Sequence, residues 1–272
     1  MGRDHRQHTK LFPEPTAENL FYGEIAIDLD MQSDMTPEYE GSAILKDIDV
    51  SLANYSSHIV SLLLKDLKFE ITDLTRILDF GAGSGTLARL FDDRTGIKPI
   101  CVELDEGLTN SLKGEGFQVF QTLDAIDLDS LDFIYTSNVL EHIEFDEDIL
   151  RILASKLKSG GMIAIYVPAF PILFSNLDRN VGHYRRYTRV ELVQKLSNSG
   201  FQEIRCNFND SLGFFATFLL KLIRFKFNSG GEATLLMNIY DYFLFPISKV
   251  FDVLGCRYFL GKNLVASAKV SK

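Results

Sequence analysis

A carboxylate followed by three glycines at alternate positions is the first group of residues in this sequence that could bind a ligand. Asp79 precedes Gly81, Gly83 and Gly85, between an apolar run and a helical pattern at 86–91. Glycines at a sharp strand-to-helix turn let the backbone approach a ligand and direct a helix N-terminus at it. The G-x-G-x-G spacing differs from that of dinucleotide-binding loops, and no lysine follows as in a Walker loop. Because a carboxylate would oppose a pyrophosphate, the loop suits a cationic ligand.

Acidic and polar residues also end the next apolar runs. Glu103 lies 18 residues after Gly85, close to the offset at which an acid meets ribose hydroxyls in nucleotide-binding folds. Asp124 follows the third apolar run, and Asn138 ends the fourth. The carboxyl ends of parallel strands meet at one rim, which is where such sheets bind ligands. The sequence therefore predicts that these side chains gather around one ligand.

A second group of reactive side chains lies in the string G-H-Y-R-R-Y-T at 182–188, after the strand 162–167, where a loop is expected to run to about Tyr187. His183 is the natural candidate for a general base, because the reference pKa of histidine is near 6.5. Arg185 and Arg186 could bind a phosphate or carboxylate through their forked donors. In the alternative interpretation, all three side chains tie the loop to the rest of the domain through carboxylates and carbonyls.

The elements that position these residues follow from hydrophobic periodicity. Apolar runs alternate with helical patterns over 76–168, which predicts a parallel sheet with helices on both faces. One or two helices are expected between Glu40 and about Leu67, after an irregular arm over 1–40. A helix from Thr188 to Ser199 has a capping-box pattern, and strands at 203–208 and 264–270 should complete the sheet as an antiparallel pair.

The segment 209–262 interrupts that last pair of strands. It holds nine of the 22 phenylalanines and a basic cluster of Lys221, Arg224 and Lys226. Neither of its apolar runs reaches the 18 or more uncharged residues that cross a bilayer, so a helical hairpin is expected. Three uses remain open for it: a roof over an apolar acceptor pocket, contact with a membrane surface, or a homodimer interface.

Charge and cysteine content limit the kinds of partner and the cellular compartment that we expect for this protein. The net charge of the 272 residues is −9, and 11–50 alone supplies it with ten acids against Lys46. The remainder is nearly neutral and lacks the basic footprint of nucleic-acid enzymes, so no nucleic-acid partner is expected. Three cysteines without a C-x-x-C pair and a start without an apolar leader favour a cytoplasmic protein, with peripheral membrane contact as an open alternative.

The order of the motifs resembles that of the class I S-adenosylmethionine (SAM)-dependent methyltransferases. The resemblance rests on four motifs: D-F-G-A-G-S-G from Asp79, E-L-D-E-G-L from Glu103, V-L-E-H-I at 139–143 and K-S-G-G before the strand 162–167. The resemblance implies a Rossmann-like α/β fold with a seven-stranded sheet, here with a helical N-terminal cap and a C-terminal helical insertion. The expected division is an arm and cap (1–75), a SAM-binding core (76–208), the insertion (209–262) and a final strand (263–272).

The same resemblance implies SAM as the cofactor and assigns residues to it. The expected cofactor-binding residues are Asp79, Gly81, Ala82, Gly83, Gly85, Glu103, Leu104, Asp124, Ser137 and Asn138. The string at 182–188 resembles a subgroup associated with bacterial polysaccharide and lipid-linked sugar pathways. We therefore expect methyl transfer to an oxygen of an apolar or lipid-linked, sugar-type small molecule, with His183 deprotonating or orienting it and Tyr184, Arg185 and Arg186 binding it. N-methylation, a non-methylating SAM-dependent reaction and a SAM-binding accessory protein are the alternatives.

The pair Glu141-His142 resembles part of the E-x-x-E-H string of two metal-using relatives, the ubiquinone-pathway O-methyltransferases and the small-RNA 2′-O-methyltransferases. There, carboxylates and a histidine hold a divalent ion near the acceptor oxygen. In this sequence the first position of the string is Asn138, which lacks the charged ligand. The sequence therefore predicts no metal ligands.

Overall fold

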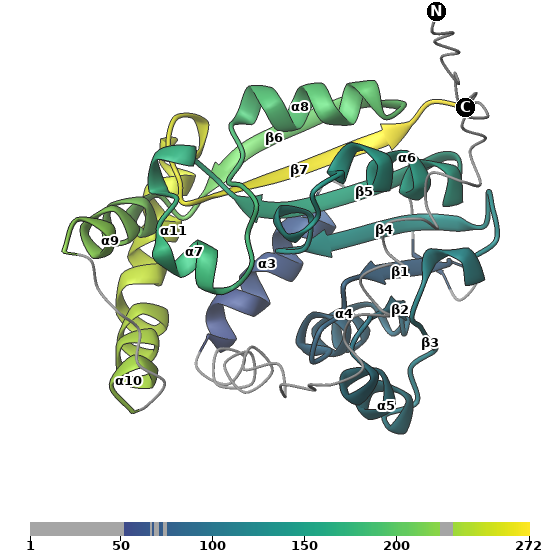
Figure 1. Ribbon diagram of the computed structural model, residues 1–272, viewed down its shortest axis with the longest axis horizontal. Helices are drawn as coiled ribbons and strands as arrows, with labels where there is room; N and C mark the ends of the chain where they lie inside the picture. Colours follow the sequence, from purple (N-terminus) through teal and green to yellow (C-terminus); the bar gives the residue numbers. More distant parts are fainter. Residues whose placement is uncertain (1–51, 66, 68–70, 73–74, 224–230) are drawn as a thin grey trace, which may run out of the picture. The chain divides into compact units, whose positions relative to one another are not determined.

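The computed structural model describes residues 52–65, 67, 71–72, 75–223 and 231–272 (Figure 1). The chain divides into two compact units, Met1–Ser42 and Ala43–Lys272, and all described residues belong to the second. The predicted arm over 1–40 lies outside the described residues. Of the helical region predicted between Glu40 and Leu67, the described part contains helix α3 (Ala53–Lys65).

The centre of the structure is a seven-stranded sheet with the order β3-β2-β1-β4-β5-β7-β6. Strands β1 to β5 run parallel, whereas β7 lies antiparallel between β5 and β6. The predicted parallel sheet with a final antiparallel strand is therefore confirmed. The strands are β1 (Ile77–Phe80), β2 (Ile100–Val102), β3 (Val119–Phe120), β4 (Leu131–Ser137), β5 (Leu157–Pro168), β6 (Phe201–Asn209) and β7 (Asn263–Val270).

Helices cover both faces of the sheet because its central strands are apolar on both sides. In β4, Ile134 packs into one core cluster with α6 and α8, whereas its neighbours Phe133 and Tyr135 pack into another with α3 and α4. Figure 1 shows α6 and α8 on one side of the sheet and α3 on the other. The flanking helices are α4 (Thr86–Thr95), α5 (Glu106–Gly114), α6 (Asp146–Lys156) and α8 (Arg189–Asn198).

The predicted capping box of α8 is present. The Thr188 side chain accepts a hydrogen bond from the Glu191 N–H, and the Glu191 side chain accepts one from the Thr188 backbone N–H. The chain leaves the helix through Gly200, whose φ of 88° is the left-handed conformation that glycine adopts without steric cost. The local sequence alone therefore set both ends of this helix.

The segment between β6 and β7, which we call the insertion, is helical as expected. Its first residue follows Asn209, which pairs with Asn263 of β7, and Asn263 pairs in turn with Pro168 at the carboxyl end of β5. The insertion therefore leaves and rejoins the sheet at the rim where ligands are expected. Its elements are α9 (Ser211–Leu222), α10 (Gly231–Ile239), η4 (Tyr240–Leu244), α11 (Phe245–Val253) and η5 (Cys256–Tyr258).

Proline explains the irregular turn in this helical run. Pro246 has no backbone N–H and cannot extend a regular α-helical ladder. The preceding turn, η4, widens to a π-helix in which the Phe245 N–H bonds to the Tyr240 carbonyl. The widened turn places Phe245, which is fully buried, against Tyr55 of α3 with a ring-centroid distance of 4.8 Å. The insertion is thus packed against α3.

Buried acids of the insertion cap two helices that lie far from them in the sequence. Asp241 accepts hydrogen bonds from the Asn54 N–H at 3.0 Å and the Tyr55 N–H at 2.8 Å, at the start of α3. Asp252 accepts hydrogen bonds from the Asp210 N–H at 2.7 Å and the Ser211 N–H at 3.1 Å, at the start of α9. Both carboxylates therefore satisfy donors that a helix N-terminus leaves without partners.

Replacing Asp241 with alanine should lower the free energy of unfolding by about 2 kcal/mol, because two buried N–H groups lose their acceptor. Urea denaturation followed by circular dichroism would measure the change. Asp93→Ala, at an exposed position of α4, is the matched control and should have an effect below about 0.5 kcal/mol. Equal effects for the two variants would show that the cap contributes nothing.

Candidate active site

The glycine turn after β1 has the geometry that the sequence predicts. Gly81, Gly83 and Gly85 all have positive φ angles, of 79°, 55° and 84°. A Cβ at Gly81 would lie 2.3 Å from a methyl carbon of Val139, so only glycine fits the approach of the chain after β4. A Cβ at Gly83 would meet no described atom within 4 Å, which leaves its surroundings open. Helix α4 begins directly after Gly85 and has no side-chain cap, so its first N–H groups remain available to a ligand.

Asp79 lies in the interior beneath this turn. It is 2% exposed, and its Oδ2 atom has no hydrogen-bond partner among the described residues. Burial raises the pKa of the carboxyl group to about 7, and the nearby Glu103 carboxylate acts in the same direction. A buried carboxylate with an oxygen that lacks a hydrogen-bond partner binds a cation favourably, because the cation replaces the lost hydration of that oxygen.

Glu103 connects the glycine turn to the end of β2. Its Oε2 atom accepts a hydrogen bond of 2.7 Å from the Gly83 N–H, and its Oε1 atom accepts one of 3.0 Å from the Asp105 N–H. Leu104 beside it is 78% exposed. Asp124 lies further along the rim in η1 (Leu123–Ala125) and is exposed. The structure thus brings Glu103 against the glycine turn, whereas no hydrogen bond joins Asp124 to that turn among the described residues.

The chain after β4 forms the other side of the turn. The Asn138 N–H bonds to the Tyr166 carbonyl of β5 at 2.8 Å, and Asn138 has a left-handed φ of 54°. Its side-chain amide lies 3.3 Å from the Ser137 hydroxyl. Val139 then packs on Gly81. The predicted cofactor residues at the ends of β1, β2 and β4 therefore lie around one region of the rim.

His183 is held by a carboxylate that sequence reasoning missed. Its Nδ1 atom lies 3.0 Å from Oδ1 of Asp178, which also accepts a hydrogen bond of 2.7 Å from Nε of Arg186. Burial opposes the ionisation of Asp178, but the hydrogen bonds from His183 and Arg186 hold its pKa at about 2. An ionised carboxylate only accepts hydrogen bonds, so Nδ1 of His183 is the donor to Asp178 and Nε2 is the ring nitrogen that this contact leaves unused.

A short helix places Asp178 there. The segment predicted to be a loop contains α7 (Asn176–Asn180), which begins at a capping box between Ser175 and Asp178. The capping-box pattern S-x-x-D at 175–178 was the signal in the sequence that could have revealed this helix. The prediction of a continuous loop up to Tyr187 is wrong for this reason.

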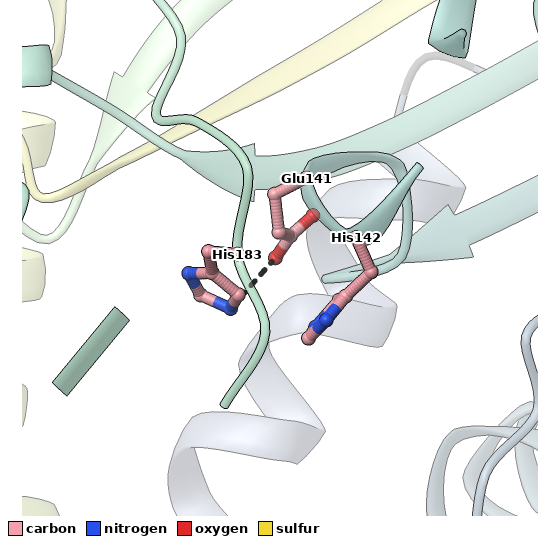
Figure 2. Close-up of side chains that lie close together, drawn as sticks. All are labelled: Glu141, His142 and His183. Carbon is pink, nitrogen blue, oxygen red and sulfur yellow. Dashed lines mark ion pairs between the residues drawn. The ribbon is translucent and has the colours of Figure 1, made fainter. Parts of the chain in front are cut away.

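Glu141 and His142 lie next to His183 (Figure 2). Oε1 of Glu141 is 3.9 Å from Nε2 of His183, and the centroids of the two imidazole rings are 4.6 Å apart in an edge-to-face arrangement. Glu141 is fully buried, and neither carboxylate oxygen has a hydrogen-bond partner among the described residues. Burial raises the pKa of Glu141 to about 8 and lowers the pKa of His142 to about 4. Both groups are therefore neutral at pH 7.

These three residues are also a candidate metal-ligand group. Each offers one ligand atom, and the three atoms lie within 4.8 Å of one another. Two histidines and one carboxylate suit zinc or another transition metal better than magnesium. The third donor, His183, comes from a separate loop and could not be inferred from the string around Glu141.

The two arginines of the loop are bound to acceptors within the protein. Nη1 of Arg185 lies 3.2 Å from Oδ1 of Asp146, and Nη2 donates to the Glu144 carbonyl at 2.7 Å. Arg186 bonds to Asp178, as described above. These contacts are what the alternative interpretation of the string expects. Tyr184, the third predicted acceptor residue, is 56% exposed.

The fold and the ligand rim define a class I SAM-dependent methyltransferase. A family model described as a methyltransferase domain matches residues 52–205, which is more than half of the chain. The chain belongs to this methyltransferase domain family. The resemblance and the fold predicted from the sequence are therefore confirmed, and with them the class of enzyme and SAM as its cofactor.

Solved structures of the same fold have low sequence identity to this chain. A SAM-dependent methyltransferase from Archaeoglobus fulgidus has a TM-score of 0.50 and 21% identity, over 74% of this chain and 88% of that chain. A Haemonchus contortus phosphoethanolamine N-methyltransferase bound to SAM has a TM-score of 0.53 and 16% identity, over 82% of this chain and 57% of that chain. A geranyl diphosphate methyltransferase bound to SAM has a TM-score of 0.51 and 12% identity, over 79% of this chain and 84% of that chain. A search of curated proteins found no match.

Proposed function

We propose that this enzyme transfers the methyl group of SAM to a hydroxyl oxygen of an apolar or lipid-linked, sugar-type small molecule. The observation that carries the proposal is the Asp178–His183 pair, which lies next to Glu141 and His142. A hydroxyl acceptor benefits from a base, whereas a neutral amine can attack the methyl group unaided. The acceptors named for the structural neighbours differ from one another, so the fold does not select one.

On this proposal, the residues around the glycine turn hold SAM. Asp79 and the backbone of Gly81, Ala82, Gly83 and Gly85 contact its methionine and ribose portions. Glu103 keeps free lone pairs for the ribose hydroxyls while it bonds to the Gly83 backbone. Leu104 and Asp124 meet the adenine, and Ser137 and Asn138 form the floor below the sulfonium. The burial of Asp79 with an unpartnered Oδ2 atom among the described residues supports its pairing with the ammonium group of SAM.

His183 acts on the acceptor through Nε2. SAM already carries a good leaving group, so the enzyme mainly aligns the acceptor oxygen with the methyl carbon and the sulfur. Bound SAM would supply the methyl group and leave as its demethylated product, and Nε2 of His183 would take the proton of the acceptor hydroxyl. A protonated Glu141 does not compete for that proton, which favours an available base at neutral pH. The exposed side chain of Tyr184 can contact the acceptor. Arg185 and Arg186 hold the loop in place through Asp146 and Asp178.

An aromatic wall beside this loop supports an apolar acceptor. Phe170, two residues after β5, stacks on Phe208 of β6 with centroids 4.9 Å apart. It also meets the edge of Phe214 of α9 at 5.1 Å, and Lys221 donates to the Ile172 carbonyl at 2.6 Å. The insertion is therefore attached to the segment that leads to His183. We propose a cytoplasmic enzyme whose insertion lines the acceptor path, and whose outer face contacts either a membrane or a second subunit.

Transfer of label from SAM would test the function. We expect the full chain to move radiolabelled methyl from SAM to polyprenyl-linked sugars or long-chain alcohols, and not to the corresponding amines at a comparable rate. Mass spectrometry of the product identifies the methylated atom. SAM binding without any product would favour an accessory protein, and a product without an added methyl group would favour a different alkyl transfer.

A further inference from the structure

The outer face of the insertion is unusually apolar. Among the described residues, 16 of the 23 exposed large hydrophobic side chains lie between Phe215 and Phe259. Phe243 is 69% exposed, Leu254 is 77% exposed and Phe259 is 80% exposed. Large exposed apolar side chains that gather on neighbouring elements mark contact sites for other proteins or for membranes. We call this surface, over α9, α10, η4, α11 and η5, the apolar face.

The charged side chains that the structure describes on the apolar face have one sign where they reach solvent. The acids of the insertion whose side chains are described, Asp210, Asp241 and Asp252, are all buried and bonded to helix N-termini. Among the described side chains of the insertion, those charged groups that reach solvent are basic, and they include Lys221, Lys249 and Arg257. The chain as a whole has a net charge of −9, so this distribution is local to the apolar face. An anionic partner matches it.

A second copy of the chain matches it poorly. In a symmetric dimer the same patch lies on both sides of the interface, so each side would bring the basic side chains of Lys249 and Arg257. Like charges in an interface disfavour association, and the acids of the insertion whose side chains are described are already buried at helix N-termini. A lipid surface with anionic headgroups accepts both the apolar side chains and the basic ones.

The form of the helices agrees with a position in the plane of a membrane. The insertion consists of short helical elements with polar contacts on the side that faces the sheet. None of the helices in the described part of the chain combines the length and apolar character that a membrane span requires. An interfacial helix buries one face in the headgroup region and keeps the other on the protein.

We propose that the apolar face docks this enzyme on an anionic membrane surface, with its large side chains in the interface and its basic side chains at lipid phosphates. This docking deepens the proposed function, because a lipid-linked acceptor would reach the rim from the same surface. The docking itself does not depend on the reaction, since we infer it from the exposed apolar side chains and the basic side chains of the apolar face.

Vesicle sedimentation of the full chain tests the docking without SAM or acceptor. We expect binding to vesicles of phosphatidylcholine with about 30% phosphatidylglycerol, taken as a typical anionic mixture, at least roughly tenfold tighter than to phosphatidylcholine alone and weaker at high salt. The double variant Phe243→Glu, Phe259→Glu should lose at least about tenfold of this binding. Val190→Glu, at a side chain of α8 that is 75% exposed, is the matched control and should bind as the wild type does.

Two results would overturn the docking. One is equal binding of the double variant and the wild type, or no binding of the wild type to either vesicle. The other is a dimer, seen by light scattering, that the double variant dissociates while vesicles bind nothing, because the face would then belong to a second copy. The docking and the reaction are tested separately. If the wild type binds no vesicles but still transfers methyl groups to a soluble acceptor, the docking fails and the proposed function stands.

Discussion

Asp79→Asn should weaken SAM binding by roughly 30-fold or more, because it removes the charge that a buried ammonium group would meet beneath the glycine turn. Truncating one partner of a buried charge pair costs about 2–5 kcal/mol, and about 1.4 kcal/mol is tenfold in Kd. Isothermal titration calorimetry with SAM and with its demethylated product would measure the loss. Asp93→Asn, at an exposed acid of α4, is the control and should bind as tightly as the wild type.

The same carboxylate should make SAM binding depend on pH. In the free protein, burial raises the pKa of Asp79 to about 7, whereas the bound cation stabilises the ionised form. Below about pH 7 the carboxyl group must release a proton before it can pair with SAM, so Kd should rise as the pH falls from about 8 to about 6. The Asp79→Asn variant should lack this dependence. A wild-type Kd that is constant over this range would contradict the assignment of Asp79 to the ammonium group.

The stability of the free protein should respond to pH in the opposite way. The folded pKa of Asp79 lies above the ordinary value of 3.8, so folding favours the protonated form. This contribution to stability is fully present below about pH 4 and is lost as the pH rises through about 7. Saturating SAM should cancel part of that loss.

His183→Ala should lower kcat about 100- to 10,000-fold while it leaves the affinity for SAM unchanged. The imidazole acts on the acceptor proton and lies apart from the glycine turn, so calorimetric SAM binding also serves as the control for folding. Asp178→Asn tests the positioning of the imidazole. Since a carboxamide can stabilise the wrong tautomer of His183, this variant should lose kcat and change the pH profile while it binds SAM normally.

Two results would contradict the role of His183 as a base. Wild-type turnover in His183→Ala would show that the reaction needs no base, as an amine acceptor would allow. If a chelator abolished activity and a divalent transition metal restored it, Glu141, His142 and His183 would instead be metal ligands. We expect no effect of a chelator, because the sequence predicts a metal-free site.

The sequence predicted the parts of the fold that depend on local pattern. The alternating strands and helices over 76–168, the glycine turn and the capping box at Thr188 all follow from residue spacing over short distances. The contacts that assemble the reactive groups do not. Helix α6, strand β5 and helix α7 lie between Glu141 and His183 in the sequence, and the 3.9 Å approach of the two side chains joins residues from separate segments. No periodicity in the sequence encodes that distance.

Charged residues were harder to interpret for a related reason. Arg185 and Arg186 have the same pattern in the sequence whether they bind a substrate or a buried carboxylate. In the structure their partners are Asp146 and Asp178, both 2% exposed. Asp241 likewise reads as a charge that interrupts an apolar run, yet it caps α3 from a position 187 residues further along the chain. Only tertiary structure distinguishes these roles.

The pairing of Asn209 with Asn263 gives the insertion the topology of an enlarged hairpin turn. Its two ends are neighbours in the sheet, so its length can vary without a change in strand register. The entropy of closing a loop grows only with the logarithm of its length, about 0.6 kcal/mol for each doubling. Lengthening a short turn to this size therefore costs on the order of 2 kcal/mol before any packing compensates for it. The length and sequence of the insertion can thus change while the seven-stranded sheet keeps its strand order and register.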